Sequence, residues 1–144
     1  MEKKKFFVSV RSYIENLDDF GLTESTESDV VSAACNYAFA GGVAHISYET
    51  ESEGVKTKTE ITSERGYVRL LRSGGIDSVM EFSEGELTKT LYRIPPYAFD
   101  AEIDSKKIRS SLGECGGTLE LLYYLSIGGA KKKMRLSLTV AAGA

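Results

Sequence analysis

The sequence has no tryptophan, two prolines, two cysteines and one histidine among its 144 residues. Cys35 and Cys115 lie far apart and form no CxxC motif or Cys/His ligand spacing, which argues against a structural zinc site and a disulfide framework. We expect free thiols in a reducing compartment, buried as small apolar side chains. A redox pair is the alternative, because two thiols bridge only if the fold brings them together.

The scarcity of histidine limits the catalytic mechanisms available. Any Ser/His or Cys/His mechanism would have to use His45, and no GxSxG motif or reactive cysteine context supplies its nucleophile. His45 is therefore either a strand residue at a surface or rim, or a general base or ligand. We predict no catalytic residue, no metal site and no cofactor, and an enzyme is the least supported class.

Long apolar runs are also missing. No stretch approaches the roughly 20 apolar residues of a transmembrane helix. Arg11 and Glu15 interrupt the apolar segment after the basic start before it reaches signal-peptide length. The net charge of −3 and pI near 5.3 favour neither nucleic acid nor an anionic membrane as a partner. We therefore expect a cytoplasmic protein without nucleic-acid or membrane partners.

The chain does contain many short segments of alternating polar and apolar residues, cut by glycine. A period of two is typical of half-buried β-strands, and the clearest example is Lys133–Val140. The pattern predicts about ten strands. They are expected at 6–14, 30–39, 43–50, 55–61, 67–72, 76–82, 86–94, 97–104, 118–127 and 133–140.

Three segments interrupt this pattern. The stretch 16–29 is polar and acidic, lacks the ligand spacing of an EF-hand, and is predicted to be a loop or short helical turn. Pro95-Pro96 is expected at a corner or edge, because proline donates no ladder hydrogen bond. The stretch 105–117 is expected to hold a bulge or a short extra strand.

Hairpin-length connections favour an up-and-down meander, and closure into a barrel removes exposed edges. The sequence thus predicts an all-β fold, with residues 1–144 forming one antiparallel barrel domain.

Several local patterns occur in an order and spacing that resemble the YwiB-like family of uncharacterised bacterial proteins. The Arg-Ser-Gly segment followed by Ser-x-Met-x-Phe is the most specific of them. The matching segments are Ile46-Ser47-Tyr48-Glu49, Thr57-Lys58-Thr59, 71–82, Pro96-Tyr97 and 116–125.

The resemblance implies a calycin-type antiparallel barrel, similar in shape to lipocalins and fatty-acid-binding proteins. It implies no activity and carries over no catalytic residue. The chain departs from the family at 94–98, where Thr-Pro-Tyr-Gly is usual, and at His45, where an aromatic residue is usual. The corner and one barrel-facing position are therefore expected to differ in detail.

One arginine is the strongest candidate for a binding role. Arg72 shares a strand face with Val68 and Leu70, so it points inward if that face lines the lumen. An inward arginine is costly unless paired, and its planar fork suits a carboxylate or phosphate. The alternative is an internal salt bridge, for example with Glu49 or Glu81.

Tyrosines are the other candidates, because each offers an apolar body with a polar tip. They either line a cavity or fill a closed barrel. The candidate ligand-binding residues are Tyr48, Tyr92, Tyr97 and Tyr123, together with Arg72.

Two functions follow from these residues. The first is a non-catalytic barrel that binds a small apolar or carboxylate-bearing ligand in its lumen. The alternative is an interaction module with a packed barrel, acting through a homodimer or other protein contacts.

Overall fold

The computed structural model describes residues 5–94 and 96–143, which form ten β-strands and no helix within those ranges. The prediction of an all-β fold is confirmed. The strands are β1 (Phe6–Leu17), β2 (Thr23–Ala40), β3 (Val43–Ser52), β4 (Val55–Glu64), β5 (Tyr67–Gly74), β6 (Asp77–Ser83), β7 (Leu87–Ile94), β8 (Tyr97–Ser110), β9 (Gly116–Ile127) and β10 (Ala130–Ala142).

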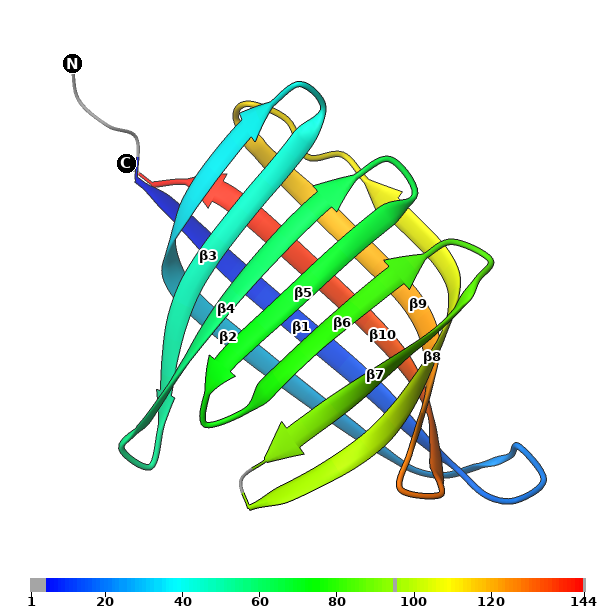
Figure 1. Cartoon of the computed structure of the whole chain (residues 1–144). Helices are drawn as coiled ribbons and strands as arrows, with labels where there is room; N and C mark the ends of the chain where they lie inside the picture. The colour runs from blue at the N-terminus through cyan, green and yellow to red at the C-terminus, as the bar shows by residue number, and fades with distance from the viewer. Residues whose placement is uncertain (1–4, 95, 144) are drawn as a thin grey trace.

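Each strand pairs antiparallel with the next along the chain, and β1 pairs with β10 from Phe6↔Ala142 to Leu17↔Lys131. The result is the closed up-and-down barrel predicted from the alternation. Figure 1 shows β3 to β6 crossing in front of β1, β2, β9 and β10, which run in another direction behind them. The barrel is thus flattened into two inclined walls that share one core.

Two short joints connect these walls. The β2–β3 joint consists of five register pairs, from Asn36↔Ser47 to Ala40↔Val43. The β6–β7 joint consists of Asp77↔Arg93 and Ser78↔Tyr92. Beyond it the hydroxyls of two β7 threonines donate to β6 carbonyl oxygens, so side chains replace the backbone ladder there.

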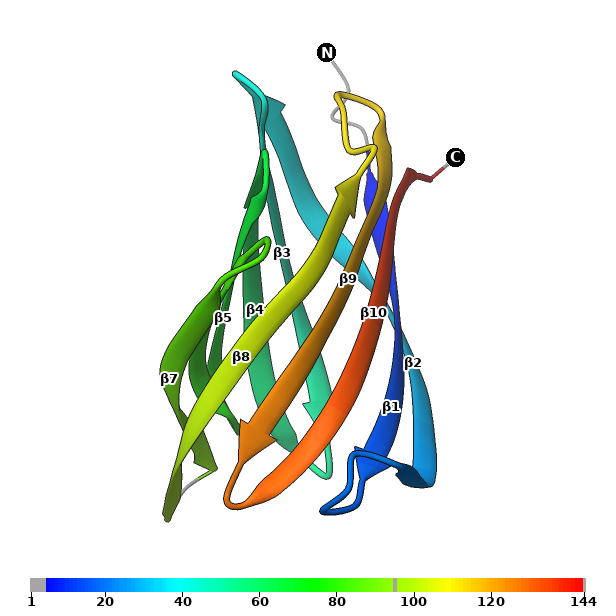
Figure 2. The ribbon, with the colours of Figure 1, turned by 90° about the vertical axis from the view of Figure 1, so that its right-hand side faces the viewer.

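The strands' turns gather at the two ends of the barrel. One end holds the turns that follow the odd-numbered strands, and three of them stand side by side at the bottom of Figure 2. These turns are β1–β2, β3–β4, β5–β6, β7–β8 and β9–β10. We call this the Arg72 end, because β5 reaches it at Arg72. Pro96 lies in the β7–β8 turn, as expected of a corner, whereas Pro95 lies outside the described residues.

The acidic stretch 16–29 differs from its prediction. Only residues 18–22 form a turn, because β1 runs to Leu17 and β2 begins at Thr23, and β2 pairs with β1 from Thr23 to Cys35. The alternation is hidden here because every residue from 21 to 30 is exposed, so neither face needs apolar side chains. The predicted bulge is confirmed, as the β8–β9 register shifts between Ser105 and Lys107 while β8 continues to Ser110.

The core fills the half of the barrel away from the Arg72 end. Val68, Ile103 and Leu138 are completely buried, and the Phe82 ring packs edge-on against Tyr123 with centroids 4.7 Å apart. Burial of each large apolar side chain contributes about 1.5–3 kcal/mol. This half therefore provides much of the barrel's stability.

Both cysteines are free thiols, as expected, but the expectation that they are buried is wrong. Cys115 is exposed, and Cys35 is half-buried on β2. Within the described residues, no helix has the length and apolar character needed to span a membrane.

Candidate functional site

Polar side chains form one layer across five neighbouring strands near the Arg72 end. The strand registers align Tyr48↔Thr59, Thr59↔Arg72, Arg72↔Ser78 and Ser78↔Tyr92 from β3 to β7. The first four alternate with buried core residues, and Tyr92 is the register partner of the buried Ser78, so all five point to the inside of the barrel. We call these five residues the polar layer.

The β5–β6 turn holds Arg72 at this level. Gly74 has φ +115°, and a Cβ there would overlap the Lys56 carbonyl oxygen. The Gly75 amide donates to that same oxygen at 3.2 Å, and the Gly74 amide donates to Asp77 Oδ1 at 3.2 Å. Only glycine permits this approach, so the Arg-Ser-Gly-Gly segment fixes the end of β5 against β4.

Arg72 is half-buried and forms no ion pair within the described part of the chain. The salt bridge proposed as an alternative does not form, because Glu49 and Glu81 are exposed on the outer face. Lys132 is a second half-buried, inward cation that the sequence reasoning missed. Among the described residues, no inward position of β3 to β10 carries a carboxylate, whereas on β2 the inward Glu27 accepts a hydrogen bond from Asn16. The inner face of β3 to β10 is thus positively charged.

Tyr123 reaches the polar layer from the opposite wall, on β9. Burial raises the pKa of Tyr123 to about 12, while nearby Arg72 lowers it and Tyr92 raises it. Burial likewise raises the pKa of Tyr48, partly offset by Arg72 and by a hydrogen bond with Thr59. Arg72 thus acts on both Tyr48 and Tyr123, and their raised pKa values keep both tyrosines neutral at physiological pH.

Two buried hydroxyl groups at this level lack partners. The Oγ atoms of Ser78 and Ser105 are buried with no hydrogen-bond partner. Ser78 is the register partner of Arg72, and Ser105 is that of Tyr123. A buried polar group without a partner costs about 1–3 kcal/mol. The hydroxyls therefore offer hydrogen bonds that the described protein groups leave unused.

The structure brings together four of the five candidate ligand-binding residues. They are Arg72, Tyr48, Tyr92 and Tyr123. Tyr97 lies apart, 64% exposed on the β7–β8 hairpin, where it stacks on Phe99 with centroids 6.4 Å apart.

A hollow of about 510 Å³ opens beside this layer where β2 and β3 diverge. Beyond Asn36, toward the Arg72 end, β2 pairs with β1 alone, so no ladder closes the space between β2 and β3. Cys35 and Tyr48 are among the lining residues, and burial raises the pKa of the Cys35 thiol. Tyr48 is the member of the polar layer that lines this hollow.

His45 lies outside the barrel. Its side chain is exposed, so the expected barrel-facing difference is wrong at this position, and its Nδ1 lies 3.4 Å from Thr62 Oγ1. No group of three or more His, Cys, Asp or Glu side chains that could hold a metal occurs in residues 5–94 and 96–143.

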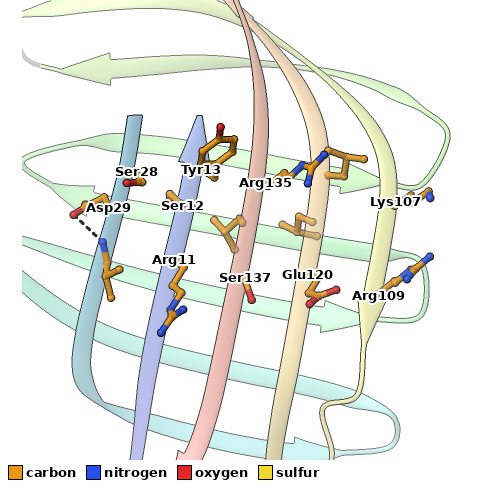
Figure 3. Close-up of a pocket in the computed structure, with 14 residues that line it drawn as sticks. Arg11, Ser12, Tyr13, Ser28, Asp29, Lys107, Arg109, Glu120, Arg135 and Ser137 are labelled. Carbon is orange, nitrogen blue, oxygen red and sulfur yellow. Dashed lines mark hydrogen bonds between the residues drawn. The ribbon is translucent and has the colours of Figure 1, made fainter. Parts of the chain in front are cut away.

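A larger hollow was missed by the sequence reasoning. It has a volume of about 670 Å³ and lies on the outer face, where Arg11, Arg109 and Arg135 are among its lining residues (Figure 3). Alternation with Leu136 and Leu138 already indicates that Arg135 points outward. The register that places the three arginines together is not readable from sequence.

Comparisons with known proteins agree with the fold. A family model described as a domain of unknown function (DUF1934) matches residues 18–138. The crystal structure of the YwiB protein from Bacillus subtilis matches with a TM-score of 0.84 and 23% sequence identity, covering 98% of this chain and 93% of that one. No curated protein matches the chain. The resemblance noted from sequence is confirmed at the level of family and fold.

Proposed function

The chain belongs to the DUF1934 family, and from this premise we propose that it is a non-catalytic barrel that binds a small apolar ligand with an anionic head group. The ligand's head group contacts Arg72 inside the barrel. Its apolar body packs among Tyr48, Tyr92 and Tyr123.

The observation that carries this proposal is the unpaired inward charge of Arg72. Buried and half-buried charges normally have partners, because leaving water is costly for an ion. Arg72 has no carboxylate partner among the described residues, and Lys132 adds a second inward cation. An anionic ligand would compensate the charge of Arg72.

The neighbouring groups support the same class of ligand. A guanidinium group binds a carboxylate or phosphate through two parallel hydrogen bonds. The hydroxyls of Ser78 and Ser105 have no partner and can donate to an anion or to water bound with it. The entry route that we propose lies where β2 diverges from β3, at the hollow lined by Tyr48.

A fluorescent fatty-acid analogue, 11-(dansylamino)undecanoic acid, tests the proposal by titration. We expect saturable binding to the wild-type protein and a loss of about tenfold or more in affinity for Arg72→Gln, since a charge-assisted hydrogen bond contributes about 1.5–3 kcal/mol. Arg69→Gln is the matched control, because Arg69 is exposed on the outer face of the same strand.

Arg72→Lys keeps the positive charge but removes the planar guanidinium group. We expect its affinity for the probe to lie between those of wild type and Arg72→Gln. Circular dichroism establishes that each variant is folded. Absence of saturable binding to the wild-type protein, or equal affinities of wild type and Arg72→Gln, would contradict the proposal.

The open edge of β2 favours a second candidate function, association with another copy of the chain. Residues 23–35 pair on one side only, and such an edge can accept another strand. Glu24, Glu27 and Asp29 oppose self-pairing through charge repulsion, so we rank this candidate lower. Light scattering that shows a monomer across a wide concentration range would exclude it.

We also infer that the chain forms a calycin-like barrel. It works in the bacterial cytoplasm without nucleic-acid or membrane partners. The free thiols of Cys35 and Cys115 are compatible with a reducing compartment, and the structural relative comes from Bacillus subtilis.

A further inference from the structure

The outer hollow spans the wall formed by β2, β1, β10, β9 and β8, outside the lumen. Its lining follows two adjacent rows of cross-strand neighbours. The first row is Val30, Arg11, Ser137, Glu120 and Arg109, and the second is Ser28, Tyr13, Arg135, Leu122 and Lys107. We call these ten residues, with Asp29, the outer groove.

The outer groove is positive in a chain that is negative overall. Four basic and two acidic side chains line it, a net charge of +2, whereas the whole chain carries −3. None of the four basic groups forms an ion pair with a described residue. The Asp29 carboxylate accepts a hydrogen bond from the Val30 amide at 2.9 Å, as Figure 3 shows.

The basic side chains form two groups. Arg135 is the direct register partner of Tyr13, and Arg11 lies two residues from Tyr13 on the same face of β1. Lys107 and Arg109 occupy β8 on the far rim of the groove (Figure 3). Two strand spacings separate β10 from β8 and three separate β1 from β8, so the two groups stand about 10 to 14 Å apart at the backbone.

The floor between these groups is partly apolar. Leu122 lies between Arg135 and Lys107 in the second row, and Tyr13 and Val30 are 42% and 59% exposed at the other side. Like charges gathered on one sheet face repel one another, so the arrangement is unfavourable without an anion. The volume of about 670 Å³ lies within the usual range for small-molecule sites, about 300–1,000 Å³.

We propose that the outer groove is a second binding site, distinct from the lumen, for a small molecule with anionic groups at both ends of an aromatic or apolar body. One anionic group binds Arg11 and Arg135, and the body lies over Leu122 and beside Tyr13. The other anionic group binds Lys107 and Arg109. Arginine suits this role because its fork binds phosphate, carboxylate or sulfonate groups in a defined geometry.

The fluorescent disulfonate bis-ANS (4,4′-dianilino-1,1′-binaphthyl-5,5′-disulfonate) is a suitable probe, since it carries two anionic groups on an aromatic body. We expect Arg135→Gln and Arg109→Gln each to lower its affinity about tenfold. The matched control is Arg65→Gln, an exposed arginine in the β4–β5 turn outside this groove, which should leave the affinity unchanged. Affinity should also fall as NaCl rises, because salt screens exposed charges.

Two further variants give the test independent outcomes. Glu120→Gln removes a carboxylate beside Arg109 and should raise the affinity several-fold. Arg69→Gln, at an exposed arginine on the outer face of β5 away from this groove, should change nothing. Wild-type affinity in Arg135→Gln and Arg109→Gln, or an equal loss of affinity in Arg69→Gln, would overturn the proposal, as would an absence of binding to the wild-type protein.

Discussion

The two halves of the lumen differ in chemistry although the same strands line both. Along β5 the inward residues are Val68, Leu70 and then Arg72, and along β6 they run from Phe82 through Met80 to Ser78. On β5 and β6 the inward residues of the first half are buried, whereas many inward residues at the Arg72 end of the barrel are half-exposed.

The change occurs at one level because the strand registers place Tyr48, Thr59, Arg72, Ser78 and Tyr92 side by side. A protein selected for stability alone would continue the apolar layers, since a charge facing inward costs free energy. One half thus stabilises the barrel, and the other is the half to which we assign ligand binding.

The largest effect is expected in the packed half. Phe82→Ala should lower the free energy of unfolding by about 3–5 kcal/mol, because it removes a buried ring and leaves a cavity beside Tyr123. Urea unfolding measures this change. Leu91→Ala, at a side chain 40% exposed on β7, is the control and should cost far less. Equal losses in the two variants would contradict the assignment of the core.

Alkaline pH should weaken the barrel through Tyr123. The pKa of Tyr123 is raised to about 12 in the folded protein, so the neutral form is favoured by folding. This contribution is fully present below pH 10 and is lost as the pH rises from 10 through 12, by roughly 3 kcal/mol in total.

Urea unfolding across this range, compared between wild type and Tyr123→Phe, isolates the contribution. We expect the variant to lose less stability than wild type between pH 10 and 12. Tyr97→Phe, at an exposed tyrosine, should follow the wild-type curve. A Tyr123→Phe curve parallel to that of wild type would show that Tyr123 is not buried at this level.

A smaller effect is expected at the turn that positions Arg72. Gly74→Ala should cost about 1–3 kcal/mol, because φ is +115° and the new Cβ overlaps the Lys56 carbonyl oxygen. Gly85→Ala has a positive φ of +80° but no atom within 4 Å, so it separates backbone strain from overlap and should cost about 1 kcal/mol.

Thermal unfolding measures both glycine variants, and the dansyl probe reports on the site. We expect Gly74→Ala also to weaken probe binding, whereas Gly85→Ala should not. Equal stability and equal binding in the two variants would show that the close approach to β4 has no role.

The smallest effect should have the opposite sign. Arg72→Met is expected to stabilise the ligand-free protein by about 1 kcal/mol, because it removes an unpaired inward charge. Arg69→Met, on the outer face, should be nearly neutral. Thermal unfolding of protein freed of bound ligand distinguishes these outcomes, and destabilisation by Arg72→Met would show that Arg72 serves the fold.

The sequence predicts most of the fold because period-two alternation survives wherever one strand face is buried. The prediction from alternation fails at 16–29. There β2 is exposed, and backbone pairing with β1, rather than burial of one face, holds it in the sheet. Arg72 was found because it shares a face with Val68 and Leu70.

Lys132 was missed because the predicted last strand began at Lys133, although alternation with Met134 and Leu136 turns Lys132 inward. The outer groove could not be found from alternation, because it depends on the cross-strand register that joins Arg11, Arg135 and Arg109 from distant parts of the chain. Tyr97 was wrongly expected to bind ligand in the lumen. It lies on the part of the β7–β8 hairpin that extends beyond the barrel, and this part becomes apparent only from the lengths of β7 and β8 in the structure.

The central claim is that Arg72 recognises the charge of a ligand's head group. The most direct measurement is a binding cycle with 11-(dansylamino)undecanoic acid and its uncharged primary amide, each titrated into wild type and Arg72→Gln. We predict that wild type prefers the acid by about tenfold or more and that the preference disappears in Arg72→Gln. An equal preference for the acid in both proteins, or no preference in wild type, would contradict the claim.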